Sequence, residues 1–273
     1  MIHLRSVALK PAVDAEAHDS GYPFAVPAVA SLHAMPLEFD APVTFLVGEN
    51  GSGKSAILEG IACAAGAIAI AGDDPQRDPT LAPARALAKR LRLTWRARTQ
   101  RGFFLRAEDF FGYAKYIAML KAGLEEDLAA FDAEPGPDSY GRGLARGAYL
   151  REIGELRRTD RTVNETSHGE SFIELFQRRF VPRGLYLFDE PEAPLSPVRE
   201  LAMLAVLLQM VGEGESQFII ATHSPTLMAF PGATIYCLDA GAPRQVAWGD
   251  VEHVTVTRDF LNDPETYLRL LGE

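Results

Sequence analysis

The sequence is poor in the features that define several common classes of protein. It has two cysteines among 273 residues, Cys63 and Cys237, which are far apart and form neither a disulfide framework nor a zinc-binding spacing. The N-terminus contains no apolar core of signal-peptide length. The two most apolar runs, residues 61–71 and 201–211, are too short to cross a bilayer. We therefore expect a cytoplasmic protein with no direct membrane insertion.

Positive charge is also scarce, since the formal net charge is −10. An acidic balance excludes a general attraction to nucleic acid or anionic lipid, but it leaves room for a local basic patch. Basic residues concentrate between residues 77 and 106, where Arg92, Arg96 and Arg98 are predicted to share one strand face. Two interpretations of that face remain: contact with nucleic-acid phosphates, or a solvated strand that protects an edge from aggregation.

Short apolar runs rich in β-branched residues alternate with helical segments. Buried strands are expected at residues 43–47, 184–188, 217–222 and 234–238, with helices at 56–62 and 201–211. A C-terminal helix is expected at 259–271; we expect it to pack on the sheet, the alternative being that it docks a partner. A hairpin is expected from residues 91–98 and 102–105, and a helical subdomain from 107–166 with a break near 134–138. This alternation predicts an α/β protein with a largely parallel sheet.

The segment from Gly48 to Ser55 matches the phosphate-binding pattern G-x-x-x-x-G-K-S, between a predicted strand and a predicted helix. Its glycines let the backbone N–H groups and the helix N-terminus face phosphate oxygens. Lys54 is expected to reach the β- and γ-phosphates, and the Ser55 hydroxyl to ligate Mg²⁺. The alternative is a chance match in a glycine-rich turn. The predicted nucleotide-binding residues are Gly48, Asn50, Gly51, Ser52, Gly53, Lys54, Ser55 and Ala56.

Polar side chains follow two of the other predicted strands. Asp189 stands where it could hold Mg²⁺, and Glu190 where it could orient and polarise an attacking water. His223 could contact a γ-phosphate and sense its departure. The alternatives are a solvated turn for the acids and a structural or exposed histidine. Together with the phosphate-binding loop they predict that Lys54, Glu190 and His223 are catalytic and that Ser55 and Asp189 ligate the metal.

In this order and spacing, the motifs resemble the ABC ATPase superfamily. More closely, the chain resembles bacterial stand-alone ATPases of the AAA family with an ABC-type nucleotide-binding domain, distant relatives of the SMC and RecF group. The matching strings are Tyr22-Pro23-Phe24, Val47 to Ser55, Arg106 to Phe111, Ser167 to Ser171, Phe188 to Pro197 and Ala221 to Pro225.

The resemblance implies an α/β P-loop NTPase of the ABC ATPase type. Its mixed, mostly parallel sheet would be flanked by helices, and an antiparallel β-subdomain and a helical subdomain would be added to it. One ATPase domain would cover residues 1–273, with the core lobe formed by 1–106 and 172–273 and the helical subdomain by about 107–171.

The resemblance also adds residues to the expected ATP site. Ser167 and Gly169 match the signature segment that contacts the γ-phosphate bound by the opposing protomer. His168 and Glu170 replace the usual glycine and glutamine, which puts efficient stimulation across a dimer in question. Ser167 and Glu170 equally fit a capping box at the start of an ordinary helix.

Three further residues have roles that the resemblance suggests. Glu108 stands where the family has its Q-loop glutamine, and its carboxylate could contact Mg²⁺ or water but could donate no hydrogen bond unless protonated. It equally fits a plain acid at a helix start. Tyr22 and Phe24, upstream of the phosphate-binding loop, are candidates to stack on adenine, or else to pack in the core.

The function implied is Mg²⁺-dependent ATP binding and hydrolysis by a homodimer that closes around ATP and drives a conformational change in an unidentified protein partner. One alternative is the ATP-binding subunit of an ABC transporter, against which Glu108 and the altered signature argue. Another is an ATPase that acts on nucleic acid in DNA repair or phage defence. No heptad repeat connects the phosphate-binding loop to Ser167, which argues against a long-armed protein of the SMC type.

Overall fold

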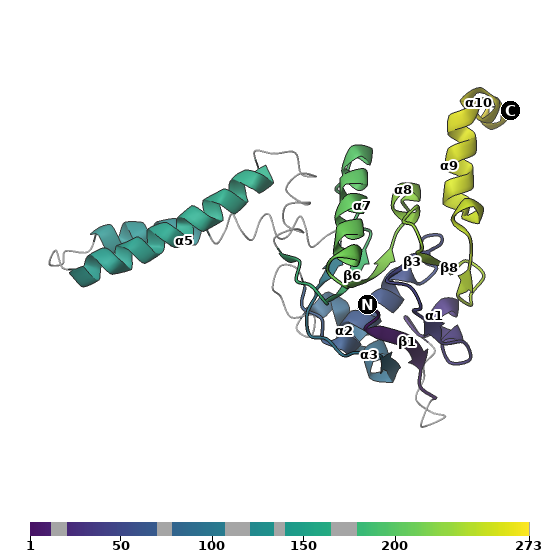
Figure 1. Ribbon diagram of the computed structural model, residues 1–273, viewed down its shortest axis with the longest axis horizontal. Helices are drawn as coiled ribbons and strands as arrows, with labels where there is room; N and C mark the ends of the chain where they lie inside the picture. The colour runs from purple at the N-terminus through teal and green to yellow at the C-terminus, as the bar shows by residue number, and fades with distance from the viewer. Residues whose placement is uncertain (12–20, 70–77, 107–120, 134–139, 165–178, 273) are drawn as a thin grey trace. The chain divides into compact units, whose positions relative to one another are not determined.

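The computed structural model describes residues 1–11, 21–69, 78–106, 121–133, 140–164 and 179–272 (Figure 1). The chain divides into two compact units. The first consists of Met1–Ala107 and Phe180–Glu273, and the second of Glu108–Arg179.

A six-stranded sheet forms the centre of the first unit, in the order β5-β6-β7-β3-β8-β9. Its strands are β3 (Val43–Val47), β5 (Phe104–Arg106), β6 (Leu185–Asp189), β7 (Gln217–Ala221), β8 (Thr234–Cys237) and β9 (Arg244–Gln245). All neighbours pair in parallel except β8 and β9. Every residue of β3, β6 and β7 is buried, as expected for strands covered on both faces. The α/β fold with a mixed, mostly parallel sheet is therefore confirmed.

A three-stranded antiparallel sheet, in the order β2-β1-β4, belongs to the same unit. Its strands are β1 (Leu4–Leu9), β2 (Leu37–Glu38) and β4 (Leu91–Trp95). The side chain of Gln217, at the start of β7, joins it to the central sheet. Its Oε1 accepts hydrogen bonds from the N–H groups of His3 and Leu4, both at 2.8 Å, and its Nε2 donates to the Leu4 carbonyl at 2.9 Å.

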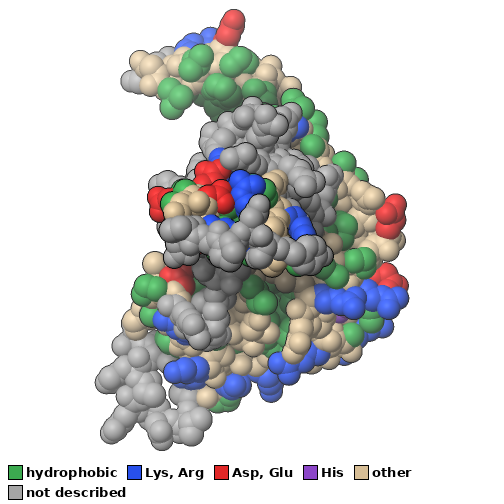
Figure 2. Space-filling model, turned by 90° about the vertical axis from the view of Figure 1, so that its left-hand side faces the viewer, with side chains coloured by type: hydrophobic (Ala, Val, Ile, Leu, Met, Phe, Trp, Pro, Cys, Tyr) green, Lys and Arg blue, Asp and Glu red, His purple; other side chains and the backbone are tan. Residues whose placement is uncertain are grey.

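The predicted hairpin of residues 91–98 and 102–105 is wrong. The first segment forms β4, which pairs with β1, whereas the second contributes β5 to the edge of the central sheet. The buried Phe104 and Leu105 fit that parallel edge, because they complete the apolar cover of β6. Alternation along β4 is as expected, and Arg92, Arg96 and Arg98 are exposed. Basic side chains are visible along the lower edge of the face drawn in Figure 2.

Besides its two sheets, the described part of the first unit contains helices. They are α1 (Pro27–Ser31), α2 (Lys54–Ala65), α3 (Ala82–Arg90), α7 (Pro197–Gly212), α8 (Pro225–Met228), α9 (Glu252–Asn262) and α10 (Pro264–Leu271), with single 3₁₀ turns η1 (Pro79–Leu81) and η2 (Trp248–Asp250). The buried face of α2 packs against α3, β4, β6 and β7, so this one helix contacts both sheets. Its position is what places the preceding loop at the sheet edge.

The C-terminal segment differs from the expected single helix on the sheet. Residues 259–271 belong to two helices, because Pro264 cannot continue α9 and Asp263 caps the new helix by accepting a hydrogen bond from the N–H of Thr266 at 3.2 Å. No residue of α10 is buried. Packing of this segment on the sheet is therefore a wrong prediction for α10.

The second unit is helical where it is described. Residues 121–133 form a helix, and α5 (Tyr140–Asn164) follows it. The guanidinium of Arg142 donates to the carbonyl of Phe131 at 2.6 Å, and Arg146 pairs with Asp132 at 2.9 Å. None of the described helices of either unit is both long and apolar enough to span a bilayer.

Candidate active site

The phosphate-binding loop connects the carboxyl end of β3 to the first residue of α2. Gly48, Gly51 and Gly53 have φ angles of 140°, 85° and 106°, in the region that favours glycine. Space is limited as well, since a Cβ on Gly48 would stand 2.5 Å from Oδ1 of Asp239 and one on Gly53 2.8 Å from Cγ1 of Val26. Conformation therefore favours glycine at all three positions, and close contact excludes a side chain at Gly48 and Gly53 as well.

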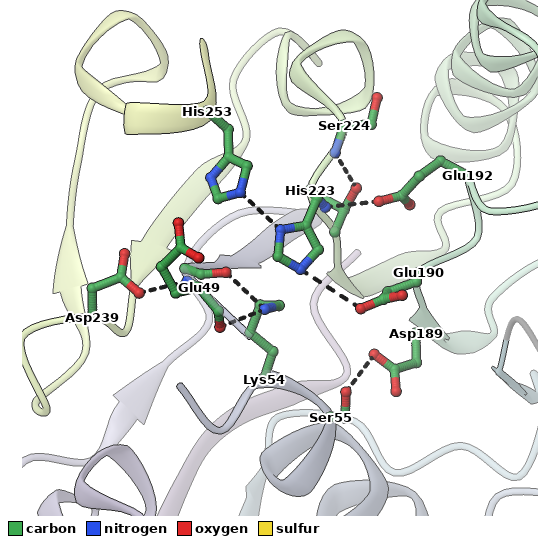
Figure 3. Close-up of polar contacts among 12 residues, drawn as sticks. Glu49, Lys54, Ser55, Asp189, Glu190, Glu192, His223, Ser224, Asp239 and His253 are labelled. Atoms are coloured by element: carbon green, nitrogen blue, oxygen red, sulfur yellow. Dashed lines mark hydrogen bonds and ion pairs between the residues drawn. The ribbon is translucent and has the colours of Figure 1, made fainter. Parts of the chain in front are cut away.

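Lys54, at the start of α2, is buried, with 4 % of its surface exposed. Its ammonium donates to the carbonyls of Gly48 at 2.7 Å and Glu49 at 3.0 Å, so the side chain folds back along the loop (Figure 3). Burial lowers the pKa of Lys54, and the nearby Glu190, Asp189, Asp239 and Glu49 oppose that shift. Phosphate oxygens could replace these carbonyl acceptors, so the buried ammonium is well suited to bind phosphate.

The loop also contains a buried hydroxyl without a hydrogen-bond partner among the described residues. The Ser52 hydroxyl oxygen makes no hydrogen bond with the described residues. A buried polar atom left unpaired costs free energy, which a ligand with acceptor oxygens would recover. Asn50 and Gly51 are exposed at the tip of the loop, and Ala56 is buried in α2. All eight predicted nucleotide-binding residues of the motif therefore lie in one continuous loop and helix start.

Ser55 and Asp189 come together from separate parts of the chain. The Ser55 hydroxyl, in the first turn of α2, donates to Oδ1 of Asp189 at the carboxyl end of β6, at 3.1 Å. Asp189 is 8 % exposed. Burial raises its pKa to about 7, with Glu59 and Glu190 adding to the rise while the Ser55 hydrogen bond and Lys54 oppose it. A nearby divalent cation would favour the ionised form of this carboxylate.

The Mg²⁺ expected from the sequence fits this pair by ligand chemistry. A hydroxyl and a carboxylate supply the oxygen ligands that Mg²⁺ prefers. Burial, the largest cause of the raised pKa of Asp189, disfavours its ionised form, and a bound cation would offset that cost. The described residues include no cluster of three or more His, Cys, Asp or Glu side chains suited to hold a metal. Mg²⁺ sites of this kind usually combine one or two protein ligands with phosphate oxygens and water.

Glu190 and His223 face each other across the ends of β6 and β7. Oε1 of Glu190 lies 3.6 Å from Nε2 of His223, beyond hydrogen-bonding distance. Nε2 is buried and has no partner among the described residues. Glu190 has a φ of 49°, uncommon for a residue with a side chain, and its N–H donates to the Ala221 carbonyl at 2.9 Å. The backbone is thus held in an unusual conformation where the candidate base stands.

Glu192 holds the backbone of His223. Its Oε1 accepts a hydrogen bond from the backbone N–H of His223 at 2.7 Å. Burial raises the pKa of Glu192, while the Thr222 hydroxyl and backbone N–H groups oppose the shift. Nearby, the Ser224 hydroxyl donates to Glu200 and accepts from the N–H of Leu227 at 3.1 Å. These bonds fix the backbone that follows β7.

Asp239, after β8, reaches the phosphate-binding loop from the other side. Its Oδ1 accepts a hydrogen bond from the N–H of Glu49 at 2.6 Å, and the Cys237 thiol contacts its Oδ2 at 3.3 Å. A small cavity of about 210 Å³ lies beside it, lined by residues that include Gly48, Asp239, Arg244 and His253. Asp239 therefore braces the start of the loop.

The two aromatic residues proposed to stack on adenine differ in their exposure. Tyr22 is 64 % exposed, and its pKa is raised by burial of the hydroxyl and by the charges of Glu59 and Asp189. Phe24 packs against the core, with the guanidinium of Arg90 5.9 Å from its ring centre. Of the two, Tyr22 has the ring surface available for stacking.

The remaining predicted site residues, Glu108, Ser167 and Gly169, lie outside the described residues. Conversely, sequence reasoning did not assign roles to Glu192, Asp239 or His253, which the structure places in the site. Glu192 had a local signal, since it follows Asp189-Glu190-Pro191 directly. Asp239 and His253 had none, because their relation to the loop depends on how distant strands and helices pack.

Comparison with known protein families finds a match in the segment that contains the phosphate-binding loop. A family model described as an AAA domain matches residues 29–84, the segment that contains β3, the phosphate-binding loop and α2. No curated protein matches the sequence.

Among solved structures, the chain is similar to ABC transporter cassettes. An ATP-binding cassette of an ABC transporter in its ADP conformation has 15 % identity and a TM-score of 0.44, with 100 % of each chain covered. A dimeric bacterial ABC transporter cassette has 17 % identity and a TM-score of 0.43, covering 91 % of this chain and 99 % of that one. An ABC transporter of metal-chelate type has 15 % identity and a TM-score of 0.45, covering 94 % and 88 %.

Proposed function

We propose that the chain is an ABC-type ATPase that binds ATP with Mg²⁺ at the loop from Gly48 to Ser55 and hydrolyses it. The observation that carries this proposal is the convergence of chemistry at one sheet edge. Ser55 meets Asp189 at 3.1 Å, and Glu190 stands 3.6 Å from His223, although these residues belong to three different segments. Ligand sites in open α/β sheets lie at the carboxyl ends of the strands, where these residues are found.

Each side chain has a distinct task in the proposed reaction. The backbone N–H groups of the loop and the ammonium of Lys54 bind the phosphates and stabilise the charge that develops on them. Glu190 accepts a proton from water as the water oxygen forms its bond to the γ-phosphorus and the bond to the bridging oxygen of ADP breaks. His223 donates a hydrogen bond from Nε2 to a γ-phosphate oxygen. Ser55 and Asp189 would hold Mg²⁺, which would neutralise phosphate charge when bound.

The proposal extends to the protein's assembly. By resemblance, Ser167 and Gly169 of a second copy would cover the ATP bound at this loop, so two copies would close around two nucleotides. Closure and release would then move an unidentified protein partner. We further propose a stand-alone bacterial protein of the cytoplasm, in keeping with its free cysteines, Cys63 and Cys237. Tyr22 would stack on the base, and Glu108 would stand near the Mg²⁺.

The central test replaces Glu190 with glutamine, which keeps the shape and removes the base. We expect Glu190→Gln to lower kcat at least about 100-fold, the usual contribution of general base catalysis, and to leave ATP affinity within a few-fold. An ATP-dependent dimer should accumulate in light scattering. The matched control is Glu265→Gln on the exposed start of α10, which should turn over ATP at the wild-type rate. Unchanged turnover in Glu190→Gln would contradict the role of Glu190, and a wild-type protein that does not bind ATP would contradict the whole proposal.

A further inference from the structure

The first turn of α9 brings a second histidine against His223. Nε2 of His253 lies 2.9 Å from Nδ1 of His223, and the two rings are tilted by 59° with their centres 4.8 Å apart (Figure 3). This contact joins the residue that follows β7 to a helix that begins beyond β9. Neither the phosphate-binding loop nor the acids of β6 require it.

The first turn of α9 is well anchored. Val251 and Val254 are buried at 5 % and 2 % exposure, and the N–H of Val254 donates to the Val251 carbonyl at 3.0 Å. The indole N–H of Trp248, in η2, donates to the Pro225 carbonyl at 3.0 Å and so ties this turn to α8. His253 is therefore held by the fold where it meets His223.

The two ring nitrogens of His223 have different surroundings. Nδ1 contacts Nε2 of His253, whereas Nε2 faces the carboxylate of Glu190 at 3.6 Å and has no hydrogen-bond partner among the described residues. A neutral imidazole carries its proton on one nitrogen only. If the proton were on Nδ1, the Nε2 lone pair would face the Glu190 carboxylate, and the two would repel. With the proton on Nε2, that N–H faces the carboxylate and the site favourably.

The surroundings of His223 favour its neutral form, in which this choice matters. Burial, Lys54 and His253 lower its pKa, and Glu190 and Glu49 oppose the shift. Besides these groups, Glu192 faces its backbone through the bond to the His223 N–H. A neutral His223 can act as a donor toward phosphate only if its proton is on Nε2.

We propose that His253 is a positioning residue for ATP hydrolysis: its Nε2–H donates to Nδ1 of His223 and holds His223 in the tautomer whose Nε2–H points to the γ-phosphate. The proposal rests on the function proposed above. Glu192 holds the backbone of His223, and His253 orients its ring. In a histidine side chain, the hydrogen bond made by one ring nitrogen determines whether the other nitrogen carries the proton.

The first experiment measures the tautomer directly and needs no nucleotide. Long-range ¹H–¹⁵N correlation spectra distinguish Nδ1–H from Nε2–H, and the chain has only six histidines to assign. In the wild-type protein His223 should be in the Nε2–H form. In His253→Leu it should become a mixture of both forms, while the exposed control His33→Leu leaves it unchanged. A His223 tautomer that does not respond to His253→Leu would overturn the proposal.

The second experiment measures turnover. We expect His253→Leu to lower kcat about 10- to 100-fold, the range found when the outer hydrogen-bond partner of a metal-binding histidine is removed, with KM within about twofold. His253→Gln, whose amide N–H can still donate, should recover part of the loss. The variant lacking both histidine side chains should be no slower than His223→Ala, because His253 acts only through His223. Additive losses would overturn the proposal. If the wild-type protein shows no ATP hydrolysis, the proposed function fails, and the spectra still decide whether His253 sets the tautomer.

Discussion

The two ends of β7 bury polar groups in opposite ways. At the amino end, Gln217 is fully buried, and its amide makes three hydrogen bonds with the backbone of β1 and the residue before it. At the carboxyl end, Asp189 on the neighbouring strand is buried beside other acids, and Nε2 of His223 has no partner among the described residues. At the amino end, the hydrogen bonds of the buried amide stabilise the fold. At the carboxyl end, Asp189 accepts a hydrogen bond from Ser55 but lies beside other acids, and with His223 it has capacity left to bind a ligand.

The largest expected effect is at the carboxyl end, where removing charge should stabilise the protein. The pKa of Asp189 is raised to about 7, so the folded state binds a proton that the unfolded state has lost above its ordinary pKa near 4. Stability therefore falls as pH rises from about 4 to 7 and then levels off. In metal-free buffer at pH 8, Asp189→Asn should be more stable than wild type by roughly 3–4 kcal/mol, shrinking to about 1 kcal/mol at pH 4.5.

Urea unfolding at the two pH values measures this difference. The exposed Asp40, replaced in the same way, should show little change at either pH. A stability difference for Asp189→Asn that is the same at both pH values would contradict a pKa raised by burial of this carboxylate.

The next effect has the opposite sign and is at the amino end. Gln217→Ala leaves the N–H groups of His3 and Leu4 buried without their acceptor, which should cost about 2–3 kcal/mol of stability at any pH from 5 to 8. Gln209→Ala, on the exposed side of α7, should change stability by less than about 0.5 kcal/mol. Equal midpoints of urea unfolding for the two variants would show that Gln217 does not hold the two sheets together.

The smallest expected effect is on ATP affinity. Two substitutions of Asp239, whose carboxylate holds the start of the phosphate-binding loop, separate the contribution of its charge from that of its hydrogen bond. Asp239→Asn keeps an acceptor for the Glu49 N–H and removes a negative charge beside the loop, so ATP should bind about two- to fivefold tighter at low salt. Asp239→Ala removes the acceptor as well and should bind about fivefold more weakly than the asparagine variant, about 1 kcal/mol. Titration calorimetry at low and high salt measures both. Identical affinities for the two variants would mean that the hydrogen bond does not organise the loop.

Much of the fold followed from local pattern. The apolar runs that became β3, β6, β7 and β8 contain enough β-branched and aromatic residues to be recognised as buried strands. Errors arose where pairing depends on distant residues. Residues 102–105 look like the return strand of a hairpin, but Phe104 and Leu105 belong to β5, which pairs in parallel with β6. The C-terminal segment shows helical periodicity, which cannot tell whether its apolar side is covered.

The candidate site divides in the same way. Gly48 to Ser55, Asp189, Glu190 and His223 were predicted because each directly follows a strand whose burial is evident from its composition, and parallel strands bring their carboxyl ends to one edge. The sequence by itself determined these residues and the chemistry they suggest. Only the tertiary structure decided that Asp239 braces the loop, that Gln217 joins the two sheets and that His253 meets His223. Those contacts join residues between 30 and 214 positions apart, and local sequence carries no information about pairs that packing alone brings together.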